Sequence, residues 1–299
     1  MSLAQQIAHS LQLSEQYVIR VARSASHRYK LFTIKKADGK TDRLIEQPSK
    51  ALKLLQRWIV RQVFDTLPTH AAAHAYVNGR SIVTNAVVHR GGRYISRLDL
   101  ENFFPSLSSA DVESLLRRNR PLVGGSTLSD EDITLVCQLV CRFGRLTIGA
   151  PSSPTISNKL LYDLDTRLAG IAAQQNAHYT RYADDLYFSS SQSGTLYDVC
   201  EQAGKAIADT VSPRLVINRR KIYHGSRKMR MVVTGLRITP DAKVSVGRGL
   251  KHRIRVVAHK ARRMSLGDTD LEWLHGMLAY VSSIEPEYVE HIKSKYEIG

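Results

Sequence analysis

Apolar side chains recur at helical spacing along much of the chain. At its start, Leu3, Ile7 and Leu11 stand four residues apart, which predicts one or two helices within residues 2–26. Ser129 is the expected N-cap of a later helix, and Ser153 with Pro154 fits the N-cap and first position of another. The further helices predicted by the same spacing cover residues 49–67, 129–142, 153–168, 195–210, 250–264 and 271–281.

Strand-like runs alternate irregularly with these helices. Two of them flank an Ala-Asp-Gly-Lys turn within residues 31–48 and predict a hairpin. Residues 93–108 read as a strand that breaks at Pro105, residues 179–190 as a second hairpin, and residues 215–246 as further strands. Because strands and helices do not alternate regularly, the sequence predicts an α+β fold.

The positive charge of the chain is concentrated in one segment. Residues 214–263 hold 16 Lys and Arg against a single acid, Asp241, whereas the rest of the chain is nearly balanced, with 27 bases and 26 acids. Such a concentration usually meets a polyanion, and we expect nucleic acid rather than a merely solvated face or an anionic membrane.

The remaining composition bears on location. No run approaches the ~18 apolar residues of a membrane span. The N-terminal segment is amphipathic and does not read as a secretory signal. The cysteines, Cys137, Cys141 and Cys200, are odd in number and suit a reducing compartment. We therefore expect a cytoplasmic protein without a membrane partner.

The candidate chemistry centres on Asp184 and Asp185, side by side in YTRYADDLYFSS. Carboxylates are costly among apolar strand residues, and neighbours on a strand point to opposite faces, so the two can serve one site only at a bend. Asp99 offers a third carboxylate. Three such groups repel one another and call for divalent cations such as Mg²⁺, and two of these ions suit phosphoryl transfer. Taken alone, Asp184 and Asp185 also fit a solvated turn. Asp99 taken alone also fits a cap at the end of a strand.

The order of these segments resembles the palm motifs of reverse transcriptases. The first motif is DLENFF around Asp99, the second is GAPSSPTISN at residues 149–158, and the third is YADD at residues 182–185. The correspondence covers roughly residues 30–240. TNAVVH at residues 84–89 and Val-Thr-Gly at residues 233–235 are similar to motifs of bacterial retron reverse transcriptases.

The resemblance implies a right-hand polymerase fold with fingers, palm and a helical thumb. Residues 1–92 would form N-terminal helices and fingers, including the Asn-Ala-x-x-His segment. Residues 93–246 would form the palm with inserted fingers helices, and residues 247–299 a basic helical thumb.

The resemblance also implies roles for single residues. The metal ligands, two Mg²⁺ ions being expected, would be Asp99, Asp184 and Asp185. Lys221 would join them in catalysis by protonating the leaving pyrophosphate. Lys36 and Arg43 would neutralise the triphosphate, although both also fit plain surface charge, and Phe104 would exclude a ribose 2′-OH. Contacts with RNA or DNA are expected from Asn85, His89, Val233, Thr234, Gly235, Lys251, Arg255 and Arg262.

Two positions leave alternatives open. Asn85 and His89 fit either RNA contact or the capping of local structure. Many reverse transcriptases carry Pro-Gln-Gly before the second motif, whereas this chain has Thr147-Ile148-Gly149. The glutamine contact with the nucleotide is therefore not expected here.

The function implied is RNA-directed DNA synthesis on a cognate structured noncoding RNA. Priming from an RNA 2′-OH with dNTPs would yield multicopy single-stranded DNA joined to RNA. An effector protein for antiphage defence and a host ribonuclease H are the other expected partners. The alternatives are a group II intron-like or diversity-generating reverse transcriptase, and a non-catalytic RNA-binding protein on a palm scaffold.

Overall fold

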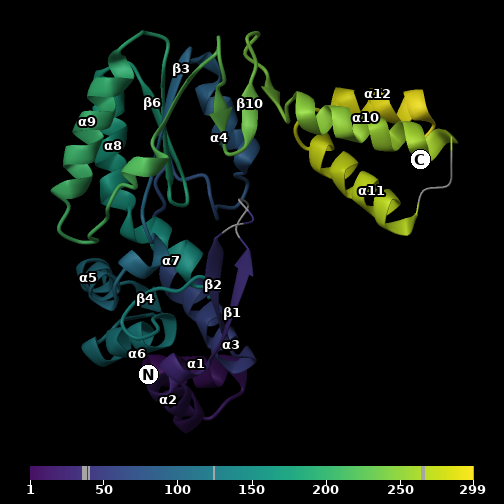
Figure 1. The fold of residues 1–299 in the computed structure, drawn as a ribbon. Helices are drawn as coiled ribbons and strands as arrows, with labels where there is room; N and C mark the ends of the chain where they lie inside the picture. The colour runs from purple at the N-terminus through teal and green to yellow at the C-terminus, as the bar shows by residue number, and fades with distance from the viewer. Residues whose placement is uncertain (36–38, 40, 124, 264–266, 299) are drawn as a thin grey trace.

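A four-stranded antiparallel sheet with the order β6-β7-β3-β8 forms the centre of the molecule (Figure 1). The structure is a computed structural model that describes residues 1–35, 39, 41–123, 125–263 and 267–298. The four strands are β3 (Tyr94–Asp99), β6 (His178–Tyr182), β7 (Asp185–Ser190) and β8 (Tyr223–Ser226).

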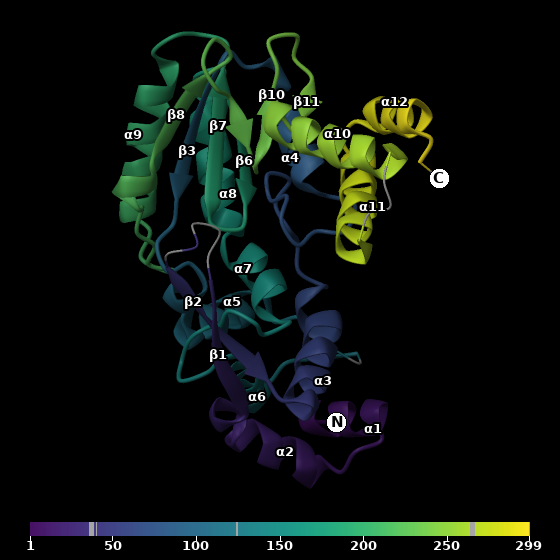
Figure 2. The ribbon, with the colours of Figure 1, turned by 45° about the vertical axis from the view of Figure 1, so that its right-hand side comes forward.

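The two faces of this sheet are covered by different elements. Leu186 and Phe188 of β7 belong to the main core with residues of α8 (Tyr162–Gln174) and α9 (Thr195–Ala208). Tyr187, between them, packs on the opposite face in a second cluster. That face is covered by α4 (Ile82–Val88), β9 (Val232–Val233), β10 (Leu236–Ile238) and β11 (Val244–Ser245), as Figure 2 shows. The alternation follows from the two-residue period of a strand.

Residues 3–64 and an excursion after β3 build a mainly helical region. Its core is continuous with that of the sheet, running from Leu3 to Leu215 without a break between the expected fingers and palm. The elements are α1 (Leu3–Leu11), α2 (Glu15–Arg23), α3 (Lys50–Ile59) extended by a π-helical turn (Val60–Phe64), α5 (Ser109–Asn119), β4 (Leu122–Val123), β5 (Ser126–Thr127), α6 (Asp130–Val140) and α7 (Ser153–Leu160).

The hairpin predicted within residues 31–48 is confirmed. Strands β1 (Tyr29–Lys35) and β2 (Asp42–Pro48) pair antiparallel from Tyr29–Pro48 to Lys35–Asp42. Its apolar side chains are exposed on the ribbon, among them Phe32, Ile34 and Leu44. Its base is held where Glu46 N–H donates to the Ile148 carbonyl at 2.8 Å. Among the described residues, these exposed apolar side chains of the hairpin are accessible to a ligand.

The C-terminal region is a separate three-helix unit (Figure 1). Helices α10 (Arg248–Arg263), α11 (Asp268–Ser282) and α12 (Pro286–Tyr296) share a small core that includes Ile254, Leu278 and Ile292. The sequence analysis expected one helix after α10, but the structure has two. Pro286 opens the second, whose buried face is narrow, with Val289, Ile292 and Tyr296. The expected boundaries at residues 92 and 246 stay predictions.

The start of α7 differs by one residue from the expectation. Ser152, rather than Ser153, occupies the N-cap position, and Pro154 is the second helical residue. The hydroxyl of Ser153 instead accepts a hydrogen bond from Thr147 N–H at 3.2 Å. The N-cap of α6 is Ser129, as predicted. Within the described residues, each helix is too short or too polar to traverse a lipid bilayer.

Candidate active site

Asp184 lies in the tight turn between β6 and β7. Tyr182 pairs with Asp185, which leaves Ala183 and Asp184 as a two-residue loop. Ala183 adopts a left-handed φ of +57°, a conformation that a residue with a Cβ rarely takes. The Asp184 carbonyl accepts a hydrogen bond from Leu100 N–H at 3.0 Å, which ties the turn to the end of β3. The bend that the sequence required for two useful carboxylates is confirmed.

Asp99 faces Asp185 across the sheet. The register of β3 and β7 makes them direct partners, and such partners have Cβ atoms about 4.5–5.5 Å apart on one face. Asp99 is buried, with 6% of its surface exposed. With Asp184 in the adjoining turn, the three predicted carboxylates gather at one corner of the sheet, which we call the carboxylate corner (Asp99, Asp184, Asp185).

Two cations and one hydroxyl approach this corner. Lys221 Nζ lies 3.0 and 3.1 Å from the two oxygens of Asp99. Arg97 Nε lies 3.6 Å from Asp185, and the Tyr187 hydroxyl donates to Asp185 at 3.2 Å. Sequence analysis had singled out Lys221 but neither Arg97 nor Tyr187. Each of these stands two residues from a corner aspartate, so strand periodicity could have indicated them.

Burial and mutual repulsion both disfavour the charged forms of the corner carboxylates. Burial raises the pKa of Asp185 to about 6, and Asp184 and Asp99 add to the shift although Arg97 opposes it. Burial also raises the pKa of Asp184, with a further contribution from Asp99 against Lys221 and Arg43. An added hard cation would relieve this repulsion.

The donor set of the corner fits such an ion. Three carboxylates provide the oxygen ligands that divalent cations such as Mg²⁺ prefer. Among the described residues, no three His, Cys, Asp or Glu side chains are already arranged as a metal-binding group. Lys221 presently occupies both oxygens of Asp99, so an ion at that carboxylate requires this ammonium to give way.

Residues predicted to meet the nucleotide surround the same corner. The half-buried ring of Phe104 lies 5.2 Å from the ring of Phe103 and 6.4 Å from that of Tyr76. Arg43, exposed on β2, is near enough for its charge to lower the pKa of Asp184. Lys36 falls outside the described residues.

The Val-Thr-Gly segment is connected to the corner by hydrogen bonds. Thr234 and Gly235 form a two-residue turn between β9 and β10, both with positive φ, while Val233 is fully buried. Thr234 N–H donates to the Tyr187 hydroxyl at 3.0 Å, and that hydroxyl donates to Asp185. Tyr187 therefore couples the position of this turn to a corner carboxylate.

Asn85 and His89 lie inside the protein. Both have no exposed surface. The His89 ring nitrogens lie 2.7 Å from the hydroxyls of Ser189 and Thr180, whereas the Asn85 amide has no hydrogen-bond partner among the described residues. Side chains without exposed surface do not reach RNA in this conformation. Both side chains therefore pack inside the protein in this conformation, and RNA contact by them stays a prediction.

The buried imidazole of His89 gives a prediction on acid stability. Burial lowers its pKa from 6.5 to about 3, with smaller contributions from His178 and His74. The unfolded chain takes up this proton near pH 6.5 but the folded protein only near pH 3, so the contribution of neutral His89 is full above pH 6.5 and is lost toward pH 3. In urea unfolding at pH 7 and pH 5, His89→Gln should lose less stability on acidification than the wild type. The exposed-site control His275→Gln should follow the wild type, and equal losses in all three would contradict the assignment.

The basic residues of α10 divide into paired and unpaired groups. Lys251 forms a short ion pair with Glu285 and lies 4.8 Å from the Tyr288 ring centre. Arg262 pairs with Glu297 at 2.5 Å. Arg255 is exposed and makes no ion pair with any residue that the structure describes. Of the three residues predicted to contact nucleic acid, Arg255 is therefore the one with a free charge.

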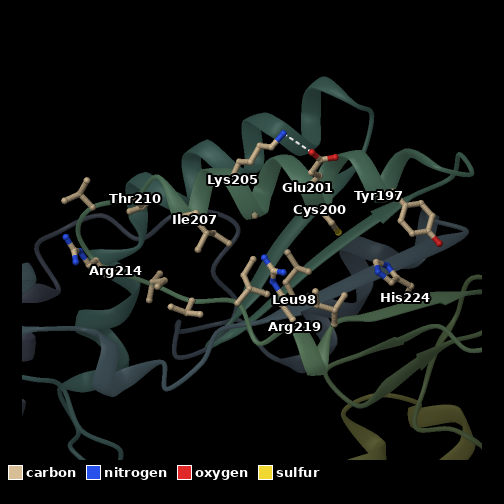
Figure 3. Close-up of a pocket in the computed structure, with 17 residues that line it drawn as sticks. Leu98, Tyr197, Cys200, Glu201, Lys205, Ile207, Thr210, Arg214, Arg219 and His224 are labelled. Carbon is tan, nitrogen blue, oxygen red and sulfur yellow. Dashed lines mark ion pairs between the residues drawn. The ribbon is translucent and has the colours of Figure 1, made fainter.

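A separate groove of about 920 Å³ lies between α9 and residues 210–224 (Figure 3). Its walls are largely apolar, with Ile207 and Leu215, and it also includes Arg214 and Arg219. None of the corner carboxylates lines it. The groove is therefore not part of the candidate active site.

Comparison with known proteins gives concordant findings. A family model described as reverse transcriptase (RNA-dependent DNA polymerase) matches residues 34–238. The chain is 32% identical to the retron Ec83 reverse transcriptase of Escherichia coli, over 93% of this chain and 90% of that protein. It is also 32% identical to the retron Ec73 reverse transcriptase of Escherichia coli, over 85% and 83% of the two.

A solved structure shows the same fold at low sequence identity. It is that of telomerase from Candida albicans in complex with the TWJ fragment of telomeric RNA, with a TM-score of 0.51 and 12% identity. The match covers 94% of this chain and 60% of that one. This likeness concerns the fold alone, and it confirms the expected α+β, right-hand polymerase architecture.

Proposed function

Because this chain belongs to the retron reverse transcriptases, a family of RNA-directed DNA polymerases, we propose that it copies a cognate structured noncoding RNA into multicopy single-stranded DNA. The observation that carries the proposal is the direct pairing of Asp99 with Asp185 beside the turn that bears Asp184. A carboxylate corner at a strand end, in a chain with this family membership, suits nucleotidyl transfer better than RNA binding alone.

In this proposal the corner carboxylates would hold the divalent metal ions that the reaction needs. Asp99 and Asp184 are the principal ligands and Asp185 a supporting one, with two Mg²⁺ ions expected. The ions would stabilise the attacking and leaving oxygens of the phosphoryl transfer. Arg97 and Tyr187 orient Asp185, because they contact its carboxylate from the same face of the sheet.

The protein's own cations act on the triphosphate. Lys221, 54% exposed in its side chain, can leave Asp99 and give a proton to the departing pyrophosphate. Arg43 reaches the corner from the β1–β2 hairpin and would neutralise phosphate charge, and Lys36 is assigned the same role on sequence grounds alone. Phe104 would lie against the sugar and exclude a 2′-OH.

The nucleic acid would lie between the sheet and the C-terminal helices. Val233, Thr234 and Gly235 would support the primer end through the backbone of their turn, since the Val233 side chain is buried. Arg255 would contact the phosphate backbone, while Lys251 and Arg262 must release their internal acids before they can do so.

The biological role proposed is that of a retron. Synthesis would begin at a 2′-OH of the RNA and leave the DNA joined to it, a host ribonuclease H would remove copied template, and an effector protein would act with the complex in antiphage defence. A group II intron-like or diversity-generating enzyme is disfavoured by the similarity to retron enzymes over most of the chain.

The nucleotide assignment can be tested together with the polymerase activity. On an RNA template with a DNA primer, the wild type should extend with dNTPs and reject rNTPs. Phe104→Ala removes the ring that meets the 2′-OH and should lower the dNTP-to-rNTP ratio of kcat/KM by roughly 10–100-fold. Phe143→Ala, a change at an exposed phenylalanine away from the corner, is the control. Unchanged selectivity in Phe104→Ala would remove Phe104 from the nucleotide site.

A further inference from the structure

Tyr76 is an exposed aromatic residue in a strained backbone conformation. Its side chain is large and apolar, yet 52% of its surface is exposed. Its φ of +60° lies in the left-handed region, which is unfavourable for a bulky residue. Exposure and strain both lower stability, so a purely structural role gives no reason for this residue at this position.

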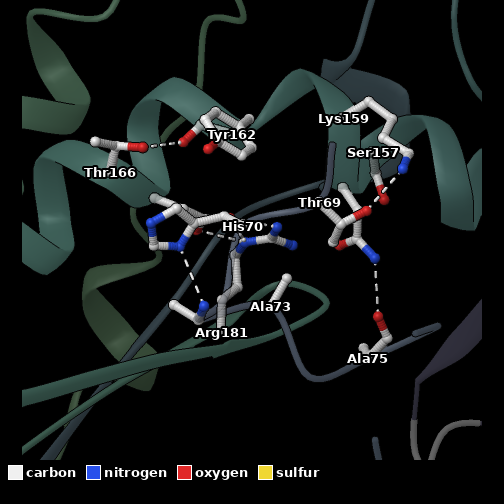
Figure 4. Close-up of polar contacts among 12 residues, drawn as sticks. Thr69, His70, Ala73, Ala75, Ser157, Lys159, Tyr162, Thr166 and Arg181 are labelled. Atoms are coloured by element: carbon white, nitrogen blue, oxygen red, sulfur yellow. Dashed lines mark hydrogen bonds and ion pairs between the residues drawn. The ribbon is translucent and has the colours of Figure 1, made fainter. Parts of the chain in front are cut away.

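The loop around Tyr76 is held by hydrogen bonds that fix this conformation (Figure 4). Asn158 Nδ2 of α7 donates to the Ala75 carbonyl at 2.9 Å, directly before Tyr76. Lys159 Nζ donates to Thr69 Oγ1 at 2.7 Å. His74 N–H donates to the Arg181 carbonyl at 2.8 Å. Strain of this kind persists only where the surroundings over-determine it, and it gathers at functional sites.

Three neighbours of Tyr76 belong to the proposed nucleotide site: Phe104, Asp184 and Arg43. Its ring lies 6.4 Å from that of Phe104, at an angle of 45°. Burial raises the pKa of the Tyr76 phenol. The Asp184 carboxylate and the Tyr182 phenol raise it further, and the Arg43 guanidinium lowers it. The phenol makes no hydrogen bond with the described part of the chain. Tyr76 therefore faces the sugar-excluding ring, a corner carboxylate and a phosphate-binding cation without an internal partner of its own.

We propose that the adjoining rings of Tyr76 and Phe104 form one continuous aromatic wall against which the sugar and base of the incoming deoxynucleotide lie. Tyr76 is then a further specificity-determining residue of the reaction. Its ring supplies apolar contact with the nucleotide, and its hydroxyl is secondary. The inference deepens the proposed function and rests on it. Asn158 acts through Tyr76 as a positioning residue, because its amide holds the preceding carbonyl.

The test is steady-state primer extension at saturating RNA template and DNA primer. Tyr76→Gly should raise KM for dNTP about tenfold with a smaller change in kcat, since it removes a binding contact. Tyr76→Phe keeps the ring and should stay within about threefold of the wild type. Tyr197→Ala, at an exposed tyrosine on α9, is the control and should leave KM unchanged.

Melting temperature separates this role from a structural one. Glycine adopts positive φ without strain, so Tyr76→Gly should melt no lower than the wild type. A fall in melting temperature together with the rise in KM would overturn the proposal, since both would then reflect a damaged fold. An unchanged KM would overturn it as well. If template–primer binding were weakened at the same time, the result would assign Tyr76 to the template instead of the nucleotide.

Different outcomes indicate a failure of the Tyr76 role and a failure of the proposed function. If the wild type fails to extend, or if Phe104→Ala leaves sugar selectivity unchanged, the nucleotide site itself is wrong. If the wild type extends and Phe104→Ala loses selectivity while Tyr76→Gly behaves as wild type, only the role of Tyr76 fails.

Discussion

Asp184→Asn is expected to reduce DNA synthesis by about 10³-fold or more while leaving RNA binding largely intact. The substitution keeps the size of the side chain but removes the charge that would hold a metal ion. Such an ion can stabilise the transition state by several kcal/mol. Each 1.36 kcal/mol of the activation free energy corresponds to a tenfold change in rate. In the proposed function the RNA backbone would be met mainly by the basic helix α10, which the change does not touch. Primer extension and filter binding measure the two properties on one preparation.

The fold of Asp184→Asn should remain at least as stable as that of the wild type. Burial and the neighbouring carboxylate disfavour the charged form of Asp184 in the folded protein, so a neutral amide relieves repulsion. Asp198→Asn, at an exposed aspartate on α9, is the matched control and should keep full activity. Extension by Asp184→Asn at the normal rate would refute the metal assignment.

Arg181→Met is expected to destabilise the protein by about 3–5 kcal/mol, the usual effect of removing one partner of a buried ion pair. Arg181 and Asp165 have no exposed side-chain surface. The guanidinium donates from Nε and Nη2 to the two Asp165 oxygens at 2.8 and 2.7 Å, and the Tyr179 hydroxyl also donates to Asp165. Methionine leaves that carboxylate buried without its cation.

The double variant Arg181→Met with Asp165→Leu provides the control. Removing both charges should recover a large part of the loss, because a well-packed apolar pair often replaces a buried ion pair at little cost. Urea unfolding of the wild type, both single variants and the double variant completes the cycle. A loss below about 1 kcal/mol in Arg181→Met would mean that the pair is solvated, since exposed pairs contribute that little.

The local structure around the three carboxylates of the candidate active site was predictable from the sequence. Two aspartates in an apolar run demanded a bend, and the register places Asp184 in a two-residue turn. Asp99 at the end of its strand required a partner strand to bring it near, and β7 supplies it. Alternation, turn signals and the spacing of the motifs are local properties, so sequence carries them well.

Contacts between distant segments were not predictable. Arg181 appeared as one more residue of YTRYADD, yet it is fully buried because Asp165 from α8 meets it. No local pattern singles out Tyr76, because its left-handed backbone and the hydrogen bond of Asn158 to the preceding carbonyl appear only in the folded chain. The sequence left both RNA contact and local capping open for His89, because its partners Thr180 and Ser189 lie 91 and 100 residues away along the chain.

The nucleic acid that co-purifies with the protein distinguishes DNA synthesis from RNA binding alone. The chain, expressed with its native flanking DNA as wild type and as Asp184→Asn, would be purified and its nucleic acid digested with ribonuclease, deoxyribonuclease and a debranching enzyme. We expect a discrete DNA in the wild type alone, joined to RNA and shortened by debranching. RNA without DNA in both preparations would contradict it and leave a protein that binds its RNA but does not copy it.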